Sequence, residues 1–242
     1  MPIIKLDAID STNDYLKQLS RESALENYTI VMAEEQTKGK GQMGAKWVSE
    51  KGKNLTMSIL VKDLVMDNKN IFDLNVAVAL SILQVLKNSN IPNISIKWPN
   101  DIMSDSKKVA GILIENTLKS KKVFNAIIGI GLNLNQTNFK DLPQATSLTN
   151  ITGENYESEK IAFLLGKSLE EYLHVLTKSP AMLWDEYHKN LYKINYPLAF
   201  EDKDGNRFMG IIRKVKKDGR LEVLREDDSI TNFEVKEIKM LY

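Results

Sequence analysis

The sequence predicts an α+β protein, with a main domain of strands and helices followed by a small domain made of strands alone. Strand patterns and helix patterns succeed each other up to residue 194, and only short strand patterns separated by turns follow. A chain of 242 residues, 43% of them hydrophobic, is long enough for one large core and one small one. We therefore expect a main domain at 1–194 and a β domain at 195–242.

The N-terminal third predicts three strands and one helix. The segment PIIKLDAI (2–9) has the pattern of a short strand, and Ser11 or Thr12 can cap the helix that DYLKQL begins. Residues 28–34 alternate like a strand and lead into a loop rich in glycine and lysine. The β-branched, apolar segment 54–61 predicts the next strand.

The middle of the chain predicts a buried helix and three further strands. Residues 71–87 are apolar nearly all round, which is typical of a helix inside a core. A strand is predicted at 94–98, where Pro99 ends it. The apolar segments 108–116 and 122–135 are separated by the turn LKSKK, which predicts a hairpin.

Two helices are predicted before the β domain. Apolar residues recur at helical spacing through 158–177, and 180–194 is expected to form a second helix. From Pro197 onward, Asp-Gly pairs at 204–205 and 218–219 separate short alternating segments, which is a strong hairpin pattern. We expect a small antiparallel barrel of about five strands there.

Bulk properties exclude several classes of protein. The net charge of +1 gives no overall reason to expect nucleic acid or a membrane surface as a partner. The absence of cysteine excludes disulfides and thiolate metal sites and fits the cytoplasm, where we expect the protein. With 2 histidines, a histidine-rich metal site is not expected. No signal peptide is evident, and no apolar run approaches the ~20 residues that span a bilayer.

The most informative segment is AEEQTKGKGQMGAKW, residues 33–47. Its glycines let the backbone turn several N–H groups toward one point, and its lysines add positive charge there. Such a loop suits phosphate or carboxylate oxygens. It is not a P-loop, because the Gly-Lys-Ser/Thr of that motif is missing. It is not a dinucleotide fingerprint either, because the third glycine of that motif is missing. On its own it also fits a flexible basic surface loop.

Two other segments place polar groups at the ends of predicted elements. DSTNDYL (10–16) offers hydroxyl and amide groups at a helix N-terminus, where they can cap the helix or bind a polar ligand. IKWPND (96–101) ends a strand with a carboxylate, which suits either an ordinary polar turn or contact with a metal or an amine.

Two predicted strand segments carry residues that could take part in binding or catalysis. KKVAGILIE (107–115) opens with two lysines, which form either a solvated pair or a fixed ammonium with a strong local field. IGIGLNLN (128–135) alternates Gly129 and Gly131, which makes room for a slender ligand or for close packing. Asn133 offers a polar group on the same face.

Taken in order, these five segments, with KGKNLTMSIL between the first loop and IKWPND, resemble biotin–protein ligase over essentially the whole chain. The resemblance implies a mixed-sheet catalytic domain of the biotin/lipoate ligase type and a C-terminal SH3-like β-barrel. Many members also carry an N-terminal DNA-binding winged helix. Because DSTN already begins at residue 10, we expect the form without it.

The resemblance also implies an activity. The expected enzyme attaches biotin to a lysine of a biotin carboxyl carrier domain in an ATP-dependent reaction. Biotinyl-5′-AMP is the intermediate, and pyrophosphate and then AMP are released. ATP and Mg²⁺ are the expected cofactors, with Mg²⁺ held mainly by the ATP phosphates. The carrier domain is the expected partner, DNA and membrane are not, and the protein is expected to be a monomer or a homodimer.

The site residues follow from matching each motif position. The residues expected to bind biotin are Ser11, Thr12, Asn13, Gln36, Gly39, Lys40, Gly41, Gln42, Lys108, Gly111 and Gly131. Those expected to bind the nucleotide are Lys40, Gln42, Trp47, Trp98, Asn100 and Asn133. Lys108, Lys40 and Asp101 are the expected catalytic residues, and no metal ligand is assigned.

The glycine loop departs from the arginine-rich GRGRRGR pattern of the family, because this chain has GKGQMGA. Lysine cannot form arginine's bidentate fork, and Gln42 carries no charge, so loop ordering is expected to depend more on backbone N–H groups. Two alternatives stay open on the sequence. One is a lipoate or octanoate ligase of the same superfamily, and the other is a non-catalytic biotin-binding paralogue.

Overall fold

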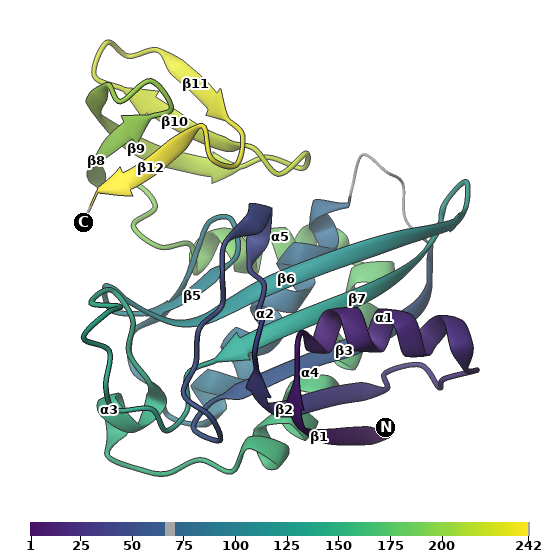
Figure 1. Cartoon of the computed structure of the whole chain (residues 1–242). Helices are drawn as coiled ribbons and strands as arrows, with labels where there is room; N and C mark the ends of the chain where they lie inside the picture. Colours follow the sequence, from purple (N-terminus) through teal and green to yellow (C-terminus); the bar gives the residue numbers. More distant parts are fainter. Residues whose placement is uncertain (66–70, 242) are drawn as a thin grey trace.

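Two β-sheets form the framework of the structure, a computed structural model that describes residues 1–65 and 71–241 (Figure 1). The larger sheet has 7 strands in the order β1-β2-β3-β7-β6-β5-β4, and the smaller has 5 in the order β11-β10-β9-β8-β12. In the larger sheet β1 and β2 are parallel and the other neighbours are antiparallel, so the sheet is mixed as expected. Its strands are β1 (Ile3–Ile9), β2 (Ile30–Gln36), β3 (Leu55–Val65), β4 (Ile94–Lys97), β5 (Asp101–Ser104), β6 (Lys107–Ser120) and β7 (Val123–Leu132).

Helices cover the two faces of this sheet unequally. They are α1 (Thr12–Glu22), α2 (Phe72–Asn88), α3 (Leu148–Thr152), α4 (Ser158–Lys178) and α5 (Pro180–Lys189). Because neighbouring strand residues point to opposite faces, Ile30 and Ile128 join the main core. Val31 and Ile127 instead pack with Leu16 of α1 in a smaller cluster. α1 lies against β3 and β7 on one face of the sheet, whereas α2 and α4 lie on the other face (Figure 1).

The smaller sheet consists of β8 (Pro197–Asp202), β9 (Arg207–Val215), β10 (Leu221–Arg225), β11 (Ile230–Phe233) and β12 (Ile238–Leu241). The turn between β9 and β10 attaches it to the main domain. Trp98 Nε1 donates a hydrogen bond to the Gly219 carbonyl at 2.8 Å, and the Val215 N–H donates to His188 Nε2 at 3.0 Å. Lys217 Nζ lies 4.5 Å above the ring of Trp184. The sheet thus rests on side chains from the β4–β5 turn and α5.

Gly219 allows a test of this attachment. Its φ is +88°, and a Cβ there would lie 2.7 Å from the ring of Phe72 on α2. Gly219→Ala is therefore expected to lower the free energy of unfolding by about 2–3 kcal/mol, since backbone strain adds to overpacking. Gly205→Ala is the matched control, because φ is +84° there with nothing within 4 Å, so only about 1 kcal/mol is expected. Equal losses in urea unfolding would contradict a tight contact with Phe72.

Most predicted elements are present, with some boundary differences. The helix predicted at 180–194 ends at Lys189 because the chain beyond it pairs with β4, where the Ile96 N–H donates to Asn190 O at 2.8 Å. No element was predicted at Asp101–Ser104, which forms β5, and the five-residue helix α3 was not predicted either. The two sheets divide between Lys189 and Pro197, and residue 242 of the predicted β domain lies outside the described residues.

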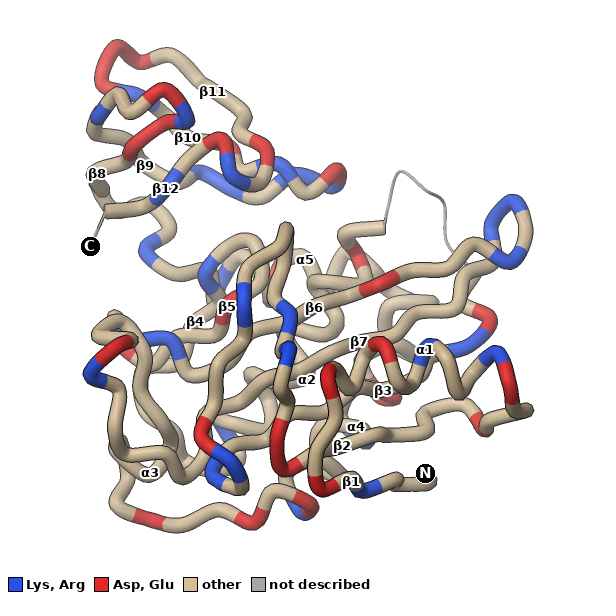
Figure 2. The backbone as a smooth tube through the Cα atoms, viewed as in Figure 1, with Lys and Arg blue, Asp and Glu red and all other residues tan. Residues whose placement is uncertain are grey.

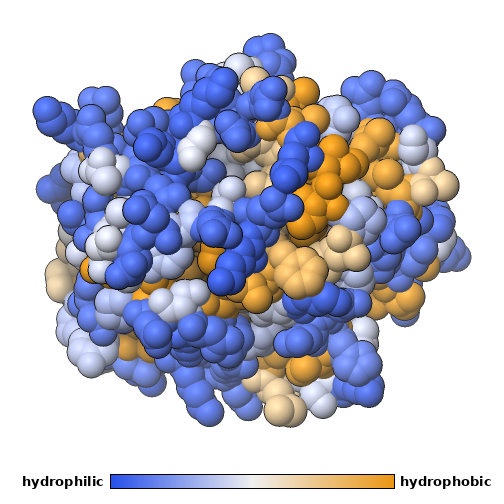
Figure 3. All heavy atoms as spheres, turned by 90° about the horizontal axis from the view of Figure 1, so that it is seen from below, coloured by the Kyte–Doolittle hydropathy of each residue, from blue (hydrophilic) through white to orange (hydrophobic). Residues whose placement is uncertain are grey.

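Polar side chains predominate on one face of the molecule. Seen from below, the molecule is mainly hydrophilic with smaller apolar patches between charged side chains (Figure 3). Among the helices within residues 1–65 and 71–241, none is long and apolar enough to cross a membrane.

Candidate active site

A cavity of ≈ 500 Å³ lies where the two sheets meet the glycine–lysine loop. Its walls come from the start of α1, the end of β2, the β4–β5 turn, β6, β7, β12 and the turn before β12. The predicted site residues that line it are Ser11, Thr12, Asn13, Gln36, Lys40, Gly41, Gln42, Trp47, Trp98, Asn100, Asp101, Lys108, Gly111 and Gly131. Gly39 and Asn133 are not among the lining residues.

The N-terminus of α1 supplies a fixed set of polar groups to one end of the cavity. Ser11 caps the helix, with its Oγ accepting from the Asp14 N–H at 3.4 Å. The Thr12 N–H and Oγ1 donate to Gln36 Oε1 at 2.8 and 3.1 Å. Ser58 of β3 donates to Asn13 Oδ1 at 2.6 Å. These side chains are held by one another, so their donors and acceptors are positioned in advance of any ligand.

Two glycines of β7 allow this close packing. A Cβ on Gly129 would lie 2.5 Å from Asn13 Oδ1, and one on Gly131 would overlap the indole of Trp47. The indole therefore lies flat against the sheet, where a side chain on β7 would otherwise stand. Trp47 Nε1 is buried without a hydrogen-bond partner in the described part of the chain, so it remains available as a donor at this position.

The glycine–lysine loop is folded into a small hairpin. The Gly41 N–H donates to Ala45 O at 2.7 Å and the Trp47 N–H donates to Gly39 O at 3.0 Å. Lys236, in the turn between β11 and β12, donates to Met43 O at 2.5 Å, which ties the loop tip to the C-terminal β unit. Gly39 thus contributes through its backbone to the closure of the hairpin.

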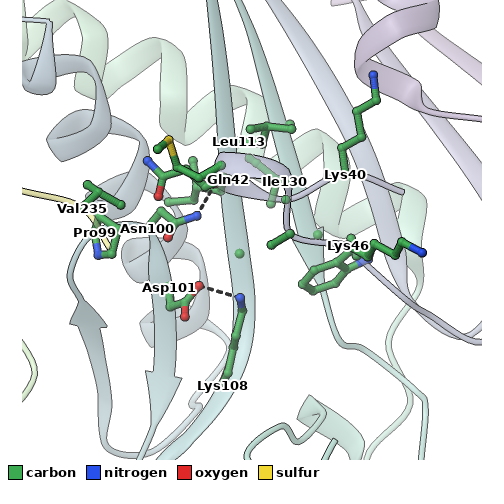
Figure 4. A pocket seen from close by; sticks show the side chains of 18 of the residues that line it. Lys40, Gln42, Lys46, Pro99, Asn100, Asp101, Lys108, Leu113, Ile130 and Val235 are labelled. Carbon is green, nitrogen blue, oxygen red and sulfur yellow. Dashed lines mark hydrogen bonds and ion pairs between the residues drawn. The ribbon is translucent and has the colours of Figure 1, made fainter. Parts of the chain in front are cut away.

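Lys40 of this loop faces α1. Its Nζ lies 2.6 Å from Asp14 Oδ2, and this hydrogen bond raises the pKa of the lysine. Figure 4 shows the side chain directed away from Lys108. In this arrangement the ammonium of Lys40 forms an ion pair with Asp14 of α1.

Lys108 is held at the opposite side of the cavity. Its backbone N–H donates to Gln144 O at 2.8 Å, and its carbonyl accepts from the Thr146 N–H at 2.9 Å. The Nζ lies 2.6 Å from Asp101 Oδ1 (Figure 4) and 5.7 Å from the centre of the Trp47 ring. Both the main chain and the side chain are therefore restrained, and the ammonium points into the cavity beside the indole.

Three predicted nucleotide-binding residues have structural partners of their own. Trp98 is 4% exposed and bonded to Gly219, as described above. Asn100 Nδ2 donates to Ile112 O at 2.7 Å, while Asn133 Nδ2 donates to Thr146 O at 3.0 Å. Asn133 is directed to the chain that flanks Lys108, so it supports that segment from behind the lining.

The sequence did not single out several residues that the fold brings to this region. Ser58 fixes Asn13, and Glu115 accepts from Asn13 Nδ2 at 2.9 Å. Lys97 and Lys239 line the cavity from β4 and β12. Lys97 belongs to the IKWPND segment and could have been noted there, whereas Lys239 lies in a part of the β domain without a motif. No group of three or more His, Cys, Asp or Glu suited to a metal ion occurs within residues 1–65 and 71–241.

Residues 6–133 match the model of the Biotin/lipoate A/B protein ligase family. The chain belongs to this family. The assignment drawn from the ordered motifs is thereby confirmed, and the matched residues contain every predicted site residue through Asn133.

Curated biotin ligases are among the relatives of this family member. It is 31% identical to the bifunctional ligase/repressor BirA of Bacillus spizizenii over 194 residues, covering 76% of this chain and 59% of that protein. It is 30% identical to the E. coli protein of that name over 228 residues, covering 93% and 69% of the two chains. It is 27% identical to the biotin--[acetyl-CoA-carboxylase] ligase of Mycobacterium tuberculosis over 214 residues, covering 87% of this chain and 79% of that protein. The chain spans about 59% of the length of the first of these relatives.

The fold of this family member is also shared over its full length. The biotin protein ligase of Aquifex aeolicus, solved in complex with biotin and ATP, matches with a TM-score of 0.80 and 26% identity, covering 99% of this chain and 98% of that one. The predicted fold class, a mixed sheet of the biotin ligase type with a C-terminal antiparallel β unit, is confirmed.

Proposed function

We propose that this protein is a biotin–protein ligase, which uses ATP to attach biotin to a lysine of a biotin carboxyl carrier domain. One observation carries the proposal. A single cavity joins a prepositioned polar set at Thr12, Asn13 and Gln36 to a restrained ammonium at Lys108. The ureido ring of biotin donates and accepts hydrogen bonds, which suits the polar set. The carboxylate of biotin is negatively charged, which suits the ammonium of Lys108.

The first step activates the biotin carboxylate. An oxygen of the carboxylate attacks the α-phosphorus of ATP, and pyrophosphate leaves, giving biotinyl-5′-AMP. Lys108 stabilises the negative charge shared by the carboxylate and the α-phosphate in the transition state. Mg²⁺ enters with the ATP phosphates as part of the substrate and neutralises charge on them. The glycine–lysine loop contributes Gly41 and Gln42 to the wall around the adenylate.

The second step transfers the biotinyl group. The lysine amine of the carrier attacks the carbonyl carbon of the mixed anhydride, and AMP leaves. The acceptor must lose a proton before it can attack, and Asp101 is the acidic group at the cavity that can orient it or accept that proton. Asp101 exchanges its partner Lys108 for the incoming ammonium in this scheme.

Biotin is favoured over lipoate as the acid. The relatives from Mycobacterium tuberculosis and Paracoccus denitrificans are named biotin--[acetyl-CoA-carboxylase] ligases, and the structural match from Aquifex aeolicus contains biotin. The carrier domain of such a carboxylase is therefore the partner we propose, and we place the reaction in the cytoplasm, with the enzyme a monomer or a homodimer. Retention of Lys108, Asp101 and Gln36 around one cavity favours a working enzyme over a non-catalytic biotin-binding paralogue.

The decisive experiment combines the purified protein, MgATP, a biotin carboxyl carrier domain and either biotin or lipoate. Intact mass of the carrier should increase by one biotinyl group with biotin and stay unchanged with lipoate. A carrier domain whose acceptor lysine is replaced by arginine is the control and should stay unmodified. Modification with lipoate alone would assign the protein to the other branch of the family. Tight biotin binding without any transfer would identify a non-catalytic binding protein.

A further inference from the structure

A carboxylate lies just beyond the end of the cavity where the start of α1 supplies its polar groups. Glu115 follows Gly111 and Leu113 at every second position of β6, so it is on the same face of the strand as these two lining residues. It is half-buried and is not itself among the lining residues. In Figure 2, α1 carries both acidic and basic residues, and β6 carries an acidic one where it passes this helix.

Both oxygens of this carboxylate are held by α1. The Oε2 atom of Glu115 accepts from Asn13 Nδ2 at 2.9 Å, and its Oε1 lies 3.2 Å from Lys17 Nζ. Asn13 and Lys17 are four residues apart, so they lie on the same face of the helix. Glu115 therefore fastens the beginning of α1 to β6 through one charged hydrogen bond and one ion pair.

The carboxylate determines which end of the Asn13 amide faces the cavity. An ionised carboxylate accepts hydrogen bonds and donates none, and the same holds for the Leu113 carbonyl, which lies 3.5 Å from Asn13 Nδ2. The end of the amide between these two acceptors is therefore its NH₂ group. The other end, Oδ1, accepts from Ser58 and is the atom that lies closest to a Cβ built on the lining residue Gly129. The amide thus presents an acceptor to the cavity.

The polarity of this end of the amide matters for a ligand. One lone pair of Asn13 Oδ1 accepts from the Ser58 hydroxyl at 2.6 Å, which leaves the second lone pair for a donor in the cavity. A ureido ring has one N–H donor on each side of its carbonyl group. If the amide were turned over, its NH₂ group would face such an N–H, and two donors would be opposed.

We propose that Glu115 is a positioning residue that fixes the Asn13 amide with Oδ1 toward the cavity and thereby makes the site selective for a ring N–H. This inference rests on the proposed function, to which it adds the group that sets the hydrogen-bond polarity of the ureido site. Glu115 acts through Asn13. Its charge also reaches the glycine–lysine loop, because the pKa of Lys40 is raised most by the hydrogen bond to Asp14 and further by the negative charge of Glu115. The test therefore separates the hydrogen bond from the charge.

The first measurement compares biotin with two cyclic carbamate analogues, in each of which oxygen replaces one ring N–H. By calorimetry, the wild-type protein should bind the analogue that lacks the N–H facing Asn13 about 100-fold more weakly than biotin. Glu115→Ala should bind biotin about tenfold more weakly and lower this ratio to about tenfold or less, because the released amide can turn and donate to the ring oxygen. An unchanged ratio would overturn the inference, because general damage to the site weakens all three ligands alike.

Two further variants separate the hydrogen bond from the charge. Lys17→Ala should change the affinity for biotin less than about threefold, because a partly exposed ion pair contributes little. In that background, Glu115→Gln removes the charge but keeps an oxygen that accepts from Asn13, so biotin affinity and the ligand ratio should return to within about threefold of the wild type. A loss as large as that of Glu115→Ala would assign the effect to the charge acting on Lys40 and overturn the inference. Glu22→Ala is the matched control, since it removes the same charge from the exposed end of α1.

A readout without ligand keeps this inference separate from the proposed function. In the amide NMR spectrum of the wild-type protein, the side-chain NH₂ of Asn13 should exchange slowly with solvent, and Glu115→Ala should remove that protection. Asn13→Asp identifies the signal, because it deletes this NH₂ group. If the wild type binds no biotin, the proposed function fails and the exchange alone decides. Loss of protection in Glu115→Ala then supports the positioning role, and equal exchange in the two proteins overturns it.

Discussion

Replacement of Lys108 by alanine is expected to lower the rate of biotin-dependent ATP–pyrophosphate exchange by about 10²–10³-fold. Removing one preorganised charge contact to a transition state costs about 3–4 kcal/mol. Lys108 is preorganised because the backbone on both of its sides is bonded to the segment 144–146 and its Nζ is held by Asp101 at 2.6 Å. The affinity for biotin alone should fall less than the exchange rate, since the ureido contacts are made elsewhere.

Lys107→Ala is the control for this result. Lys107 is the neighbour of Lys108 on β6, is exposed and does not line the cavity, so its removal changes the net charge without touching the site. Lys108→Ala also leaves Asp101 without its ion-pair partner, so thermal unfolding of both variants must accompany the kinetics. Exchange by a folded Lys108→Ala protein at more than about a tenth of the wild-type rate would remove Lys108 from the mechanism.

Lys108 could be predicted from the sequence, whereas the place of Lys239 in the cavity lining could not. Lys108 opens an apolar strand in an ordered series of motifs, and the family resemblance gives that position a function. Lys239 faces the cavity only because the β unit is attached through the β9–β10 turn, and that contact depends on Trp98 meeting Gly219 across 121 positions of sequence. A contact of this kind leaves no local pattern to detect.

The fold shows the same division between local and non-local information. The buried helix α2 was predicted because its residues are apolar on all sides, and the hairpin of β6 and β7 because two apolar segments flank a polar turn. β5 was missed since its four residues form a strand only by pairing between β4 and β6. The order of strands in the sheet places β3 against β7, and nothing in the separate segments fixes that order.

One close contact links the strand order directly to the residues proposed to bind biotin. Because β3 pairs with β7, Ser58 is the register partner of Gly129, and both face the N-terminus of α1. Gly129 leaves the space that the amide of Asn13 occupies, and Ser58 fixes the orientation of that amide. The polar groups proposed to bind the ureido ring therefore depend on Gly129, which makes no hydrogen bond to that ring in the proposed complex.

Gly129→Ala is accordingly expected to weaken biotin binding at least tenfold, even though alanine adds only a methyl group. Its Cβ would lie 2.5 Å from Asn13 Oδ1 and 3.1 Å from Asn13 Cγ, so the amide must leave its position. The displaced amide loses its hydrogen bonds to Ser58 and Glu115, and misplacing one such polar group costs about 1–3 kcal/mol in a buried site. Calorimetric titration with biotin measures the loss.

The double variant Gly129→Ala with Asn13→Ala separates this cause from general damage to β7. Once the amide of Asn13 is gone, the added methyl group has nothing to displace, so Gly129→Ala should cost almost nothing further. The two changes would then be strongly non-additive, with the double variant binding biotin about as weakly as Asn13→Ala alone. If the losses simply add, the methyl group acts through the strand and the proposed dependence of the amide on Gly129 is refuted.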